Sequence, residues 1–311
     1  MKRTLDGGPD RQARRIDGWD VVIRGRWLRT ASLADEDWHD RPIMDDPTGF
    51  ARGIRAHGLK ADLFTFAQKI PHWKPRFPFP FDWDNAAAIP ITTYQDWWQR
   101  LTTDRRKDVK RAEKQGVVVK RVELDDALVG RIVEINNDVP FRQGKRFKHY
   151  GKDFETVKRE YATFPERSEF LGAFYGDELI AILKMVYVGE LACFLEILSK
   201  TKHHDKRPVN ALISKAVEIA VEKRKSYLTY GRLQYGNKTR SSFADFKQRN
   251  GFERIVFPRY HIPLTLKGRM ALRLRLHRGL LGLLPGPLVT ALVRARARLT
   301  KKIAEKGADI S

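Results

Sequence analysis

The order of predicted strands and helices between residues 117 and 266 is the feature that most restricts how this chain can fold. Strand patterns occupy residues 117–122, 170–175, 179–188, 191–198, 227–230 and 255–264. Helical patterns occupy residues around 125–137, 153–163 and 239–250, and a further helix begins at Pro208 and carries an apolar stripe as far as Ala220. The resulting order, β-α-α-β-β-β-α-β-α-β, predicts an α/β (α+β) fold in which a mixed sheet carries helices on both faces.

The preceding residues, 17–116, predict a smaller N-terminal unit, and residues 1–16 predict a disordered basic arm. Five of the fifteen prolines lie between Pro71 and Pro90, among several Trp and Phe residues. Proline removes N–H donors, so this stretch predicts a long ordered loop held by aromatic side chains. Those side chains either plug the edge of a core or cover a substrate as a lid.

The charge of the chain and its single cysteine restrict the ligands and the kinds of site that we expect. The 311 residues include 60 Lys and Arg against 38 Asp and Glu, a net charge of +22 that attracts phosphates, nucleic acids and anionic lipids. The single cysteine, Cys193, excludes an intramolecular disulfide framework and predicts an inert buried thiol. His203, His204 and Asp205 are adjacent in a loop. Adjacent residues rarely complete a metal site without a further ligand spaced away from them, so we expect no metal site.

The tail, residues 267–311, carries eleven Lys and Arg against two acids. Its pattern predicts a basic amphipathic helix, which either lies on anionic lipid or docks on its own domain with its charges in solvent. No apolar run is long enough to span a bilayer, and the N-terminus does not look like a secretory signal. We therefore expect a cytoplasmic protein, or one that rests peripherally on the inner face of the membrane.

Two sequence motifs carry a resemblance to a known family. The element order, together with Phe246-Lys247-x-x-x-Gly251-Phe252, resembles the GNAT acyltransferase fold. A lysine at position 247, and the run from Arg106 to Val117, are similar to the FemAB branch, whose members pair two GNAT-like units. The likeness implies a GNAT-like domain at 117–266, a reduced GNAT-like unit at 17–116, and transfer of an acyl or aminoacyl group to an amine.

The resemblance also assigns candidate residues. It implies Glu196 as general base, with Lys247 or Tyr235 stabilising the oxyanion. Loop 201–210 occupies the place of the loop that cradles the donor's phosphates, although it has no glycine and Pro208 has no N–H. The implied donor-binding residues are His204, Lys206, Arg207, Asn210 and Asn237. The basic, aromatic loop 141–152 implies an acceptor site formed by Arg142, Gln143, Lys145, Arg146, His149 and Tyr150.

The sequence leaves the donor open, since either acyl-CoA or an aminoacyl-tRNA serves as co-substrate in such proteins, and it indicates no tightly bound cofactor. Two non-catalytic functions also remain open. The charge and the missing glycine-rich loop fit an RNA-binding protein that keeps the fold without its chemistry. The tail fits a protein that acts on the surface of a membrane. The acceptor amine, of a cell-envelope or another anionic molecule, is not fixed by the sequence.

Overall fold

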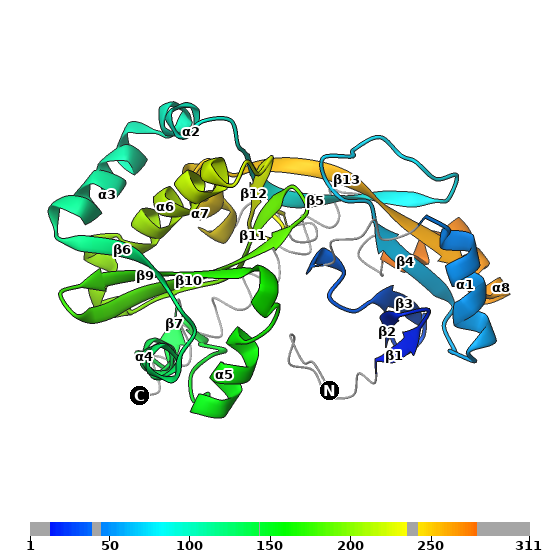
Figure 1. The fold of residues 1–311 in the computed structure, drawn as a ribbon. Helices are drawn as coiled ribbons and strands as arrows, with labels where there is room; N and C mark the ends of the chain where they lie inside the picture. The colour runs from blue at the N-terminus through cyan, green and yellow to red at the C-terminus, as the bar shows by residue number, and fades with distance from the viewer. Residues whose placement is uncertain (1–12, 39–44, 143, 235–241, 279–311) are drawn as a thin grey trace, which may run out of the picture.

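A computed structural model describes residues 13–38, 45–142, 144–234 and 242–278. These residues build one eleven-stranded mixed sheet in the order β1-β2-β3-β4-β13-β5-β12-β11-β10-β9-β6, and a separate two-stranded hairpin, β7-β8. The sheet runs through the whole molecule (Figure 1). The mixed sheet expected from the sequence is confirmed.

The strands and helices of the described residues have the following bounds. The strands of the sheet are β1 (Arg14–Ile16), β2 (Trp19–Arg24), β3 (Thr30–Leu33), β4 (Leu63–Ala67), β5 (Phe81–Pro90), β6 (Val117–Val122), β9 (Ser168–Tyr175), β10 (Glu178–Val188), β11 (Leu191–Ser199), β12 (Tyr227–Thr229) and β13 (Glu253–Pro263). The hairpin comprises β7 (Phe141–Arg142) and β8 (Lys145–Arg146). The α-helices are α1 (Pro47–Ala56), α2 (Tyr94–Arg100), α3 (Thr103–Lys114), α4 (Asp126–Asn136), α5 (Phe154–Tyr161), α6 (Pro208–Glu222), α7 (Ser242–Arg249) and α8 (Leu266–Arg273). Short 3-10 turns lie at η1 (Glu36–Trp38), η2 (Pro165–Arg167), η3 (Thr201–Lys206) and η4 (Leu276–Arg278).

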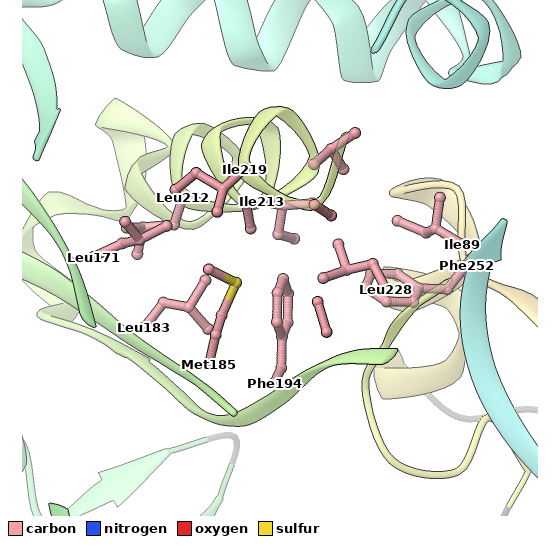
Figure 2. Close-up of a cluster of buried hydrophobic side chains, with 14 of the residues drawn as sticks. Ile89, Leu171, Leu183, Met185, Phe194, Leu212, Ile213, Ile219, Leu228 and Phe252 are labelled. Carbon is pink, nitrogen blue, oxygen red and sulfur yellow. The ribbon is translucent and has the colours of Figure 1, made fainter. Parts of the chain in front are cut away.

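Alternation along β10 explains why helices cover both faces of the sheet. Leu183 and Met185 join the core formed with α2, α3 and α6, whereas Ile182, from the opposite face, packs with α4 and α5. The larger core fills the space between the sheet and α6, where Phe194 of β11 meets Leu228 of β12 and Phe252, which lies between α7 and β13 (Figure 2). Strand β10 is therefore buried on both sides, which accounts for its nearly continuous apolar sequence.

The two halves of the chain share strands. The long β13 pairs antiparallel with β4 and with β5, and β5 in turn pairs with β12. The expected boundary between residues 116 and 117 runs through a common core, because Ile89 of β5, Trp97 of α2 and Ala112 of α3 pack against residues of α6. The N-terminal half thus supplies part of the larger core (Figure 1).

Two local expectations were wrong. The stretch from Pro71 to Pro90 is a loop only as far as Pro80, and its remainder forms β5, a central strand paired on both sides. The last residues of the expected disordered arm, Arg14–Ile16, form β1 because Ile16 is buried and the segment pairs with β2. Propensity could not predict either pairing, since each depends on a strand that lies elsewhere in the chain.

No helix of the described residues is long and apolar enough to cross a membrane. Most of the predicted basic tail, from residue 279 onward, lies outside the described residues, as do residues 1–12 of the arm. The part of the tail that is described, α8 and η4, lies beside β13.

The Phe246–Phe252 motif ties the end of α7 to helices α2 and α6 by two hydrogen bonds, which we call the α7 lock. The Nε1 of Trp97 donates a hydrogen bond to the carbonyl of Asn250 (3.1 Å), and the side chain of Asn250 accepts from Asn210 of α6 (2.9 Å). Gly251 follows α7 with φ +88°, and a Cβ there would lie 2.9 Å from Trp97 Nε1. The position requires glycine both for its backbone conformation and for its contact with the indole.

We predict that Gly251→Ala destabilises the protein by more than about 1 kcal/mol, because it adds left-handed backbone strain to a steric contact. Gly130→Ala is the matched control. Gly130 lies inside α4, and a Cβ there would meet nothing within 4 Å. The control should stabilise by up to about 1 kcal/mol through helix propensity. Chemical denaturation of both variants measures the difference, and equal stabilities would contradict this account of Gly251.

Candidate active site on strand β11

Strand β11 changes its partners along its length. It pairs with β10 throughout, but the described pairing with β12 covers only Leu191–Cys193. The β10–β11 register shifts at the same place, so that Leu195 is an extra residue between Phe194 and Glu196. A bulge of this kind redirects a side chain. Among the described residues, the β11–β12 ladder ends at Cys193, so the two strands part beyond this residue.

Glu196 follows this bulge. Its side chain keeps 24% of its surface exposed, and its carboxylate lies 3.5 Å from His149 Nε2 and 4.0 Å from Lys148 Nζ. Burial raises the pKa of Glu196 above its usual value, although the nearby Lys148 and Lys152 act against that shift. The structure thus brings the predicted base together with a residue of the predicted acceptor loop, 141–152.

His149 is held from its other side. Lys152 Nζ lies 3.1 Å from His149 Nδ1 and donates to both carboxylate oxygens of Glu160 at 2.6 and 2.7 Å. Burial lowers the pKa of His149 to about 3, and the charges of Lys148, Lys152 and Arg142 act in the same direction. The imidazole is therefore neutral. With Nδ1 accepting from Lys152, the ring proton is assigned to Nε2, which lies 3.5 Å from Glu196 but makes no hydrogen bond in this structure.

The other predicted acceptor residues divide into two groups. Arg142 turns inward, where its guanidinium lies 3.7 Å from the centre of the Phe147 ring and donates to the carbonyl of Ile135. Lys145, Arg146 and Tyr150 are exposed to solvent. Gln143 lies outside the described residues. The loop therefore combines a fixed inner side with a cationic outer side.

The predicted donor loop has few free backbone N–H groups. The N–H of Thr201 donates to Asp138, and those of Asn210 and Ala211 donate to the carbonyl of Arg207. Pro208, the first residue of α6, has no N–H to offer. The backbone of this loop therefore differs from a cradle that would hold a pyrophosphate through successive N–H groups.

The side chains of the predicted donor residues have partners of their own. Arg207 pairs with Asp108 of α3 at 3.0 Å, and Arg105 pairs with the same carboxylate at 2.7 Å. These two cations around one acid leave a local surplus of positive charge. Lys206 pairs with Asp205, and the amide of buried Asn210 belongs to the α7 lock. His204 lies within hydrogen-bond distance of Ser199, at 3.1 Å, and burial lowers its pKa.

Lys247, the second predicted catalytic residue, is fully buried. Its Nζ donates to the backbone carbonyls of Tyr230 (2.5 Å) and Arg232 (2.7 Å), just beyond β12. The ammonium also lies 4.4 Å from the centre of the Tyr230 ring. Burial lowers the pKa of Lys247 to about 8. Tyr235 and Asn237, predicted to act near this lysine, lie outside the described residues.

Sequence reasoning missed several polar residues that shape the site. Asn85 Oδ1 accepts from the N–H groups of Leu233 and Gln234, and thereby holds the segment after β12. Neighbouring Asp84 pairs with Arg232; burial raises its pKa, but the charges of Arg259 and Arg232 leave it below its usual value. In the sequence, Phe81 and Trp83 alternate with Asp82 and Asp84. This alternation could have indicated a strand that contains Asp84 and Asn85.

Lys184 of β10 is a second buried lysine that the sequence analysis did not single out. It lies opposite Glu196 in the register, and its Nζ donates to the carbonyls of Tyr161 and Thr163 and to the Thr163 hydroxyl at 2.6–2.8 Å. Burial lowers its pKa to about 7. A lysine inside the otherwise apolar run of β10 was the sequence signal. Its contacts fix the C-terminal end of α5, and so the helix that carries Glu160.

Comparisons with known proteins support the fold. The sequence matches no family model and no curated protein. Among solved structures, FemX is similar with a TM-score of 0.57 at 11% identity, over 84% of this chain and 89% of that one. L-PGS from Bacillus licheniformis is similar with a TM-score of 0.53 at 12% identity, over 86% and 89% of the two chains. A conserved protein of unknown function from Bacteroides thetaiotaomicron has a TM-score of 0.51 at 12% identity, over 82% and 86%. The resemblance to the GNAT fold of FemAB-like proteins is thus confirmed.

The buried Lys247 makes stability depend on pH in a predictable direction. Its pKa is about 8 in the folded protein and near 10.5 in the unfolded chain, so only the unfolded chain keeps this proton between those pH values. We predict that the free energy of unfolding rises between pH 8 and 10.5, by about 3 kcal/mol from this residue. In Lys247→Met this part of the rise should be absent.

Urea denaturation at pH 8, 9 and 10 measures the slope for the wild type and for Lys247→Met. Lys223→Met, at the exposed C-terminal end of α6, is the control and should keep the wild-type slope. The same slope in Lys247→Met and the wild type would show that Lys247 stays protonated in the fold.

Proposed function

We propose that this protein is an acyltransferase that moves an acyl or aminoacyl group to an amine, with Glu196 as general base. The observation that carries the proposal is the position of Glu196. It follows the bulge in β11, where β11 and β12 part, and it faces His149 of the predicted acceptor loop. The similarity of the fold to FemX and L-PGS supports the same class of reaction.

In the proposed reaction the acceptor enters as an ammonium, and Glu196 takes its proton. The amine nitrogen then bonds to the acyl carbon, and the bond between that carbon and the donor's sulfur or oxygen breaks. The nitrogen loses its second proton as the amide forms, and the leaving thiolate or alkoxide takes up a proton. The other proton, which Glu196 accepted, passes to solvent and restores the carboxylate. A carboxylate with a raised pKa is a stronger base than an ordinary surface acid, which suits the first step.

His149 is a positioning residue in this scheme. Its neutral imidazole presents Nε2–H to the Glu196 carboxylate, while Lys152 and Glu160 fix the ring from behind. We assign Lys247 a positioning role as well. It is fully buried and holds the segment after β12 by two carbonyls, so it acts on the shape of the site rather than on the substrate.

For the donor, we propose an aminoacyl-tRNA. The loop before α6 has few free N–H groups for a pyrophosphate, whereas α3 presents exposed cations at its surface, namely Lys107, Lys110, Arg111 and Lys114. Arg105 and Arg207 add a local surplus of positive charge between α3 and α6. Cationic side chains spread along a helix suit the phosphates of an extended RNA.

The test of the base is Glu196→Gln. We predict that it lowers kcat by about 10²–10⁴-fold with little effect on donor binding. The wild-type rate should fall as the pH drops through the raised pKa of Glu196, because only the carboxylate accepts a proton. Glu155→Gln, an exposed acid of α5, is the control and should keep full activity. Equal turnover in all three proteins would exclude Glu196 as the base.

The test of the donor is a binding titration of charged tRNA and of acetyl- and longer acyl-CoAs at two salt concentrations. We predict that tRNA binds, and that its affinity falls steeply with salt, with a shallower slope in Lys107→Gln/Lys110→Gln/Arg111→Gln. A salt-resistant complex with acyl-CoA would contradict the proposal of tRNA and identify acyl-CoA as the donor. RNA binding without any transfer to amines would favour the non-catalytic alternative.

A further inference from the structure

Three ligand-type side chains meet far from Glu196, in the N-terminal half of the sheet. Asp82 lies near the start of β5, His261 lies on β13, and His277 lies in η4, after α8. One potential ligand atom from each lies within 4.8 Å of the other two. The acyl transfer proposed above does not use these residues.

The sheet register explains why two of them meet. Asp82 lies opposite Arg259 in the β5–β13 ladder, and His261 is two residues further along the same strand. Residues two apart share a face, so Asp82 and His261 are diagonal neighbours on it. The chain after α8 then returns to the same face and adds His277, whose ring centre lies 4.8 Å from that of His261.

Both histidines direct Nε2 at a single carboxylate oxygen. Asp82 Oδ2 lies 3.2 Å from His261 Nε2 and 2.9 Å from His277 Nε2. The other oxygen, Oδ1, accepts from Arg278 at 2.5 Å, which fixes the orientation of the carboxylate. The side chains of His261 and His277 are 11% and 10% exposed, so the cluster is largely shielded from water.

The environment of His261 indicates a ligand rather than a hydrogen bond. His277 Nε2 is within hydrogen-bond distance of Asp82 Oδ2, at 2.9 Å, whereas His261 Nε2, 3.2 Å from the same oxygen, lacks hydrogen-bond geometry. The Nδ1 atoms of both histidines are also without a hydrogen bond. His261 is therefore a buried imidazole with both ring nitrogens free to take a ligand or a donor. Thr65, opposite His261 in the β4–β13 register, has an unpaired buried hydroxyl that is suited to the other ring nitrogen of a metal-bound histidine.

We propose that His261, His277 and Asp82 bind a zinc ion that fastens η4 to β5 and β13. Two imidazole nitrogens and one carboxylate oxygen suit zinc, whereas magnesium and calcium prefer oxygen ligands throughout. Zinc bonds of about 2.0–2.2 Å in a tetrahedron place the ligand atoms roughly 3.3–3.5 Å apart. The observed Asp82–His distances of 2.9 and 3.2 Å need to widen by a few tenths of an ångström, and the two histidine nitrogens, which lie within 4.8 Å of each other, need to draw together.

The ligand set crosses long sequence distances, so the ion would join three separate segments. This separation also explains why the sequence analysis, which looked for neighbouring ligands such as His203-His204-Asp205, did not identify the three residues as a site. The fourth position of the tetrahedron is left to water or to a further ligand. Because the ion binds the folded arrangement only, it should stabilise the protein as its concentration rises.

The test uses the full chain after treatment with a chelator. We expect one Zn²⁺ per chain by calorimetric titration, a rise of the Tm with ZnCl2 but not with MgCl2, and visible absorption bands on replacement by Co²⁺. His277→Gln and Asp82→Asn should each weaken Zn²⁺ binding by more than about tenfold and remove the Co²⁺ bands. His57→Gln, at the exposed end of α1, is the control and should bind as the wild type does.

His277→Gln is the more informative variant, because η4 is short and lies outside the hydrophobic core clusters. Circular dichroism checks that His277→Gln and Asp82→Asn are folded. The Co²⁺ spectrum of the wild type tests the site even if neither variant folds. No binding by the wild type at 100-fold excess Zn²⁺, or unchanged binding in His277→Gln, would overturn the proposal. The cluster would then be an ion-paired clasp between Asp82 and the two histidines.

Discussion

The pairing of β13 with both β4 and β5 is the constraint on which the rest of the structure depends. Because β5 continues the ladder to β12, this pairing joins the two halves of the chain into a single sheet. It also places Asp84 and Asn85 where they hold the segment that follows β12. Replacing β5 by a loop would remove one of the two strands that β12 pairs with, and with it the support of the opening beside β11.

Buried lysines have a common role around that opening. Lys184 fixes the end of α5, and Lys247 fixes the segment after β12, in both cases by donating to backbone carbonyls. Each carbonyl would otherwise be a buried acceptor without a donor, which is costly. The site therefore has a rigid frame of charge-assisted hydrogen bonds, while Glu196 itself keeps part of its surface in solvent. Such a frame suits the role of general base that we propose for Glu196, since the direction of the carboxylate decides which proton it can take.

Much of the fold could be predicted from the sequence because it rests on local signals. Strand β6 begins and ends where its β-branched run does, α6 starts at Pro208, and Gly116 follows α3 with a positive φ. The candidate site was predictable in part. Glu196 and loop 141–152 were both singled out, and the structure joins them through His149. The partners of His149, Lys152 and Glu160, were missed because nothing in a sequence pairs a loop lysine with an acid on the next helix.

By itself, the sequence determined most of the strands and helices between residues 117 and 264, since periodicity, caps and turn residues act over a few neighbouring positions. Only the tertiary structure decided that the proline-rich stretch ends in a central strand, and that Asp82, His261 and His277 meet. Those outcomes depend on which strands become neighbours, and that choice is made by burying whole faces together. Local patterns carry no record of a partner two hundred residues away, so residues joined in this way were visible only in the folded chain.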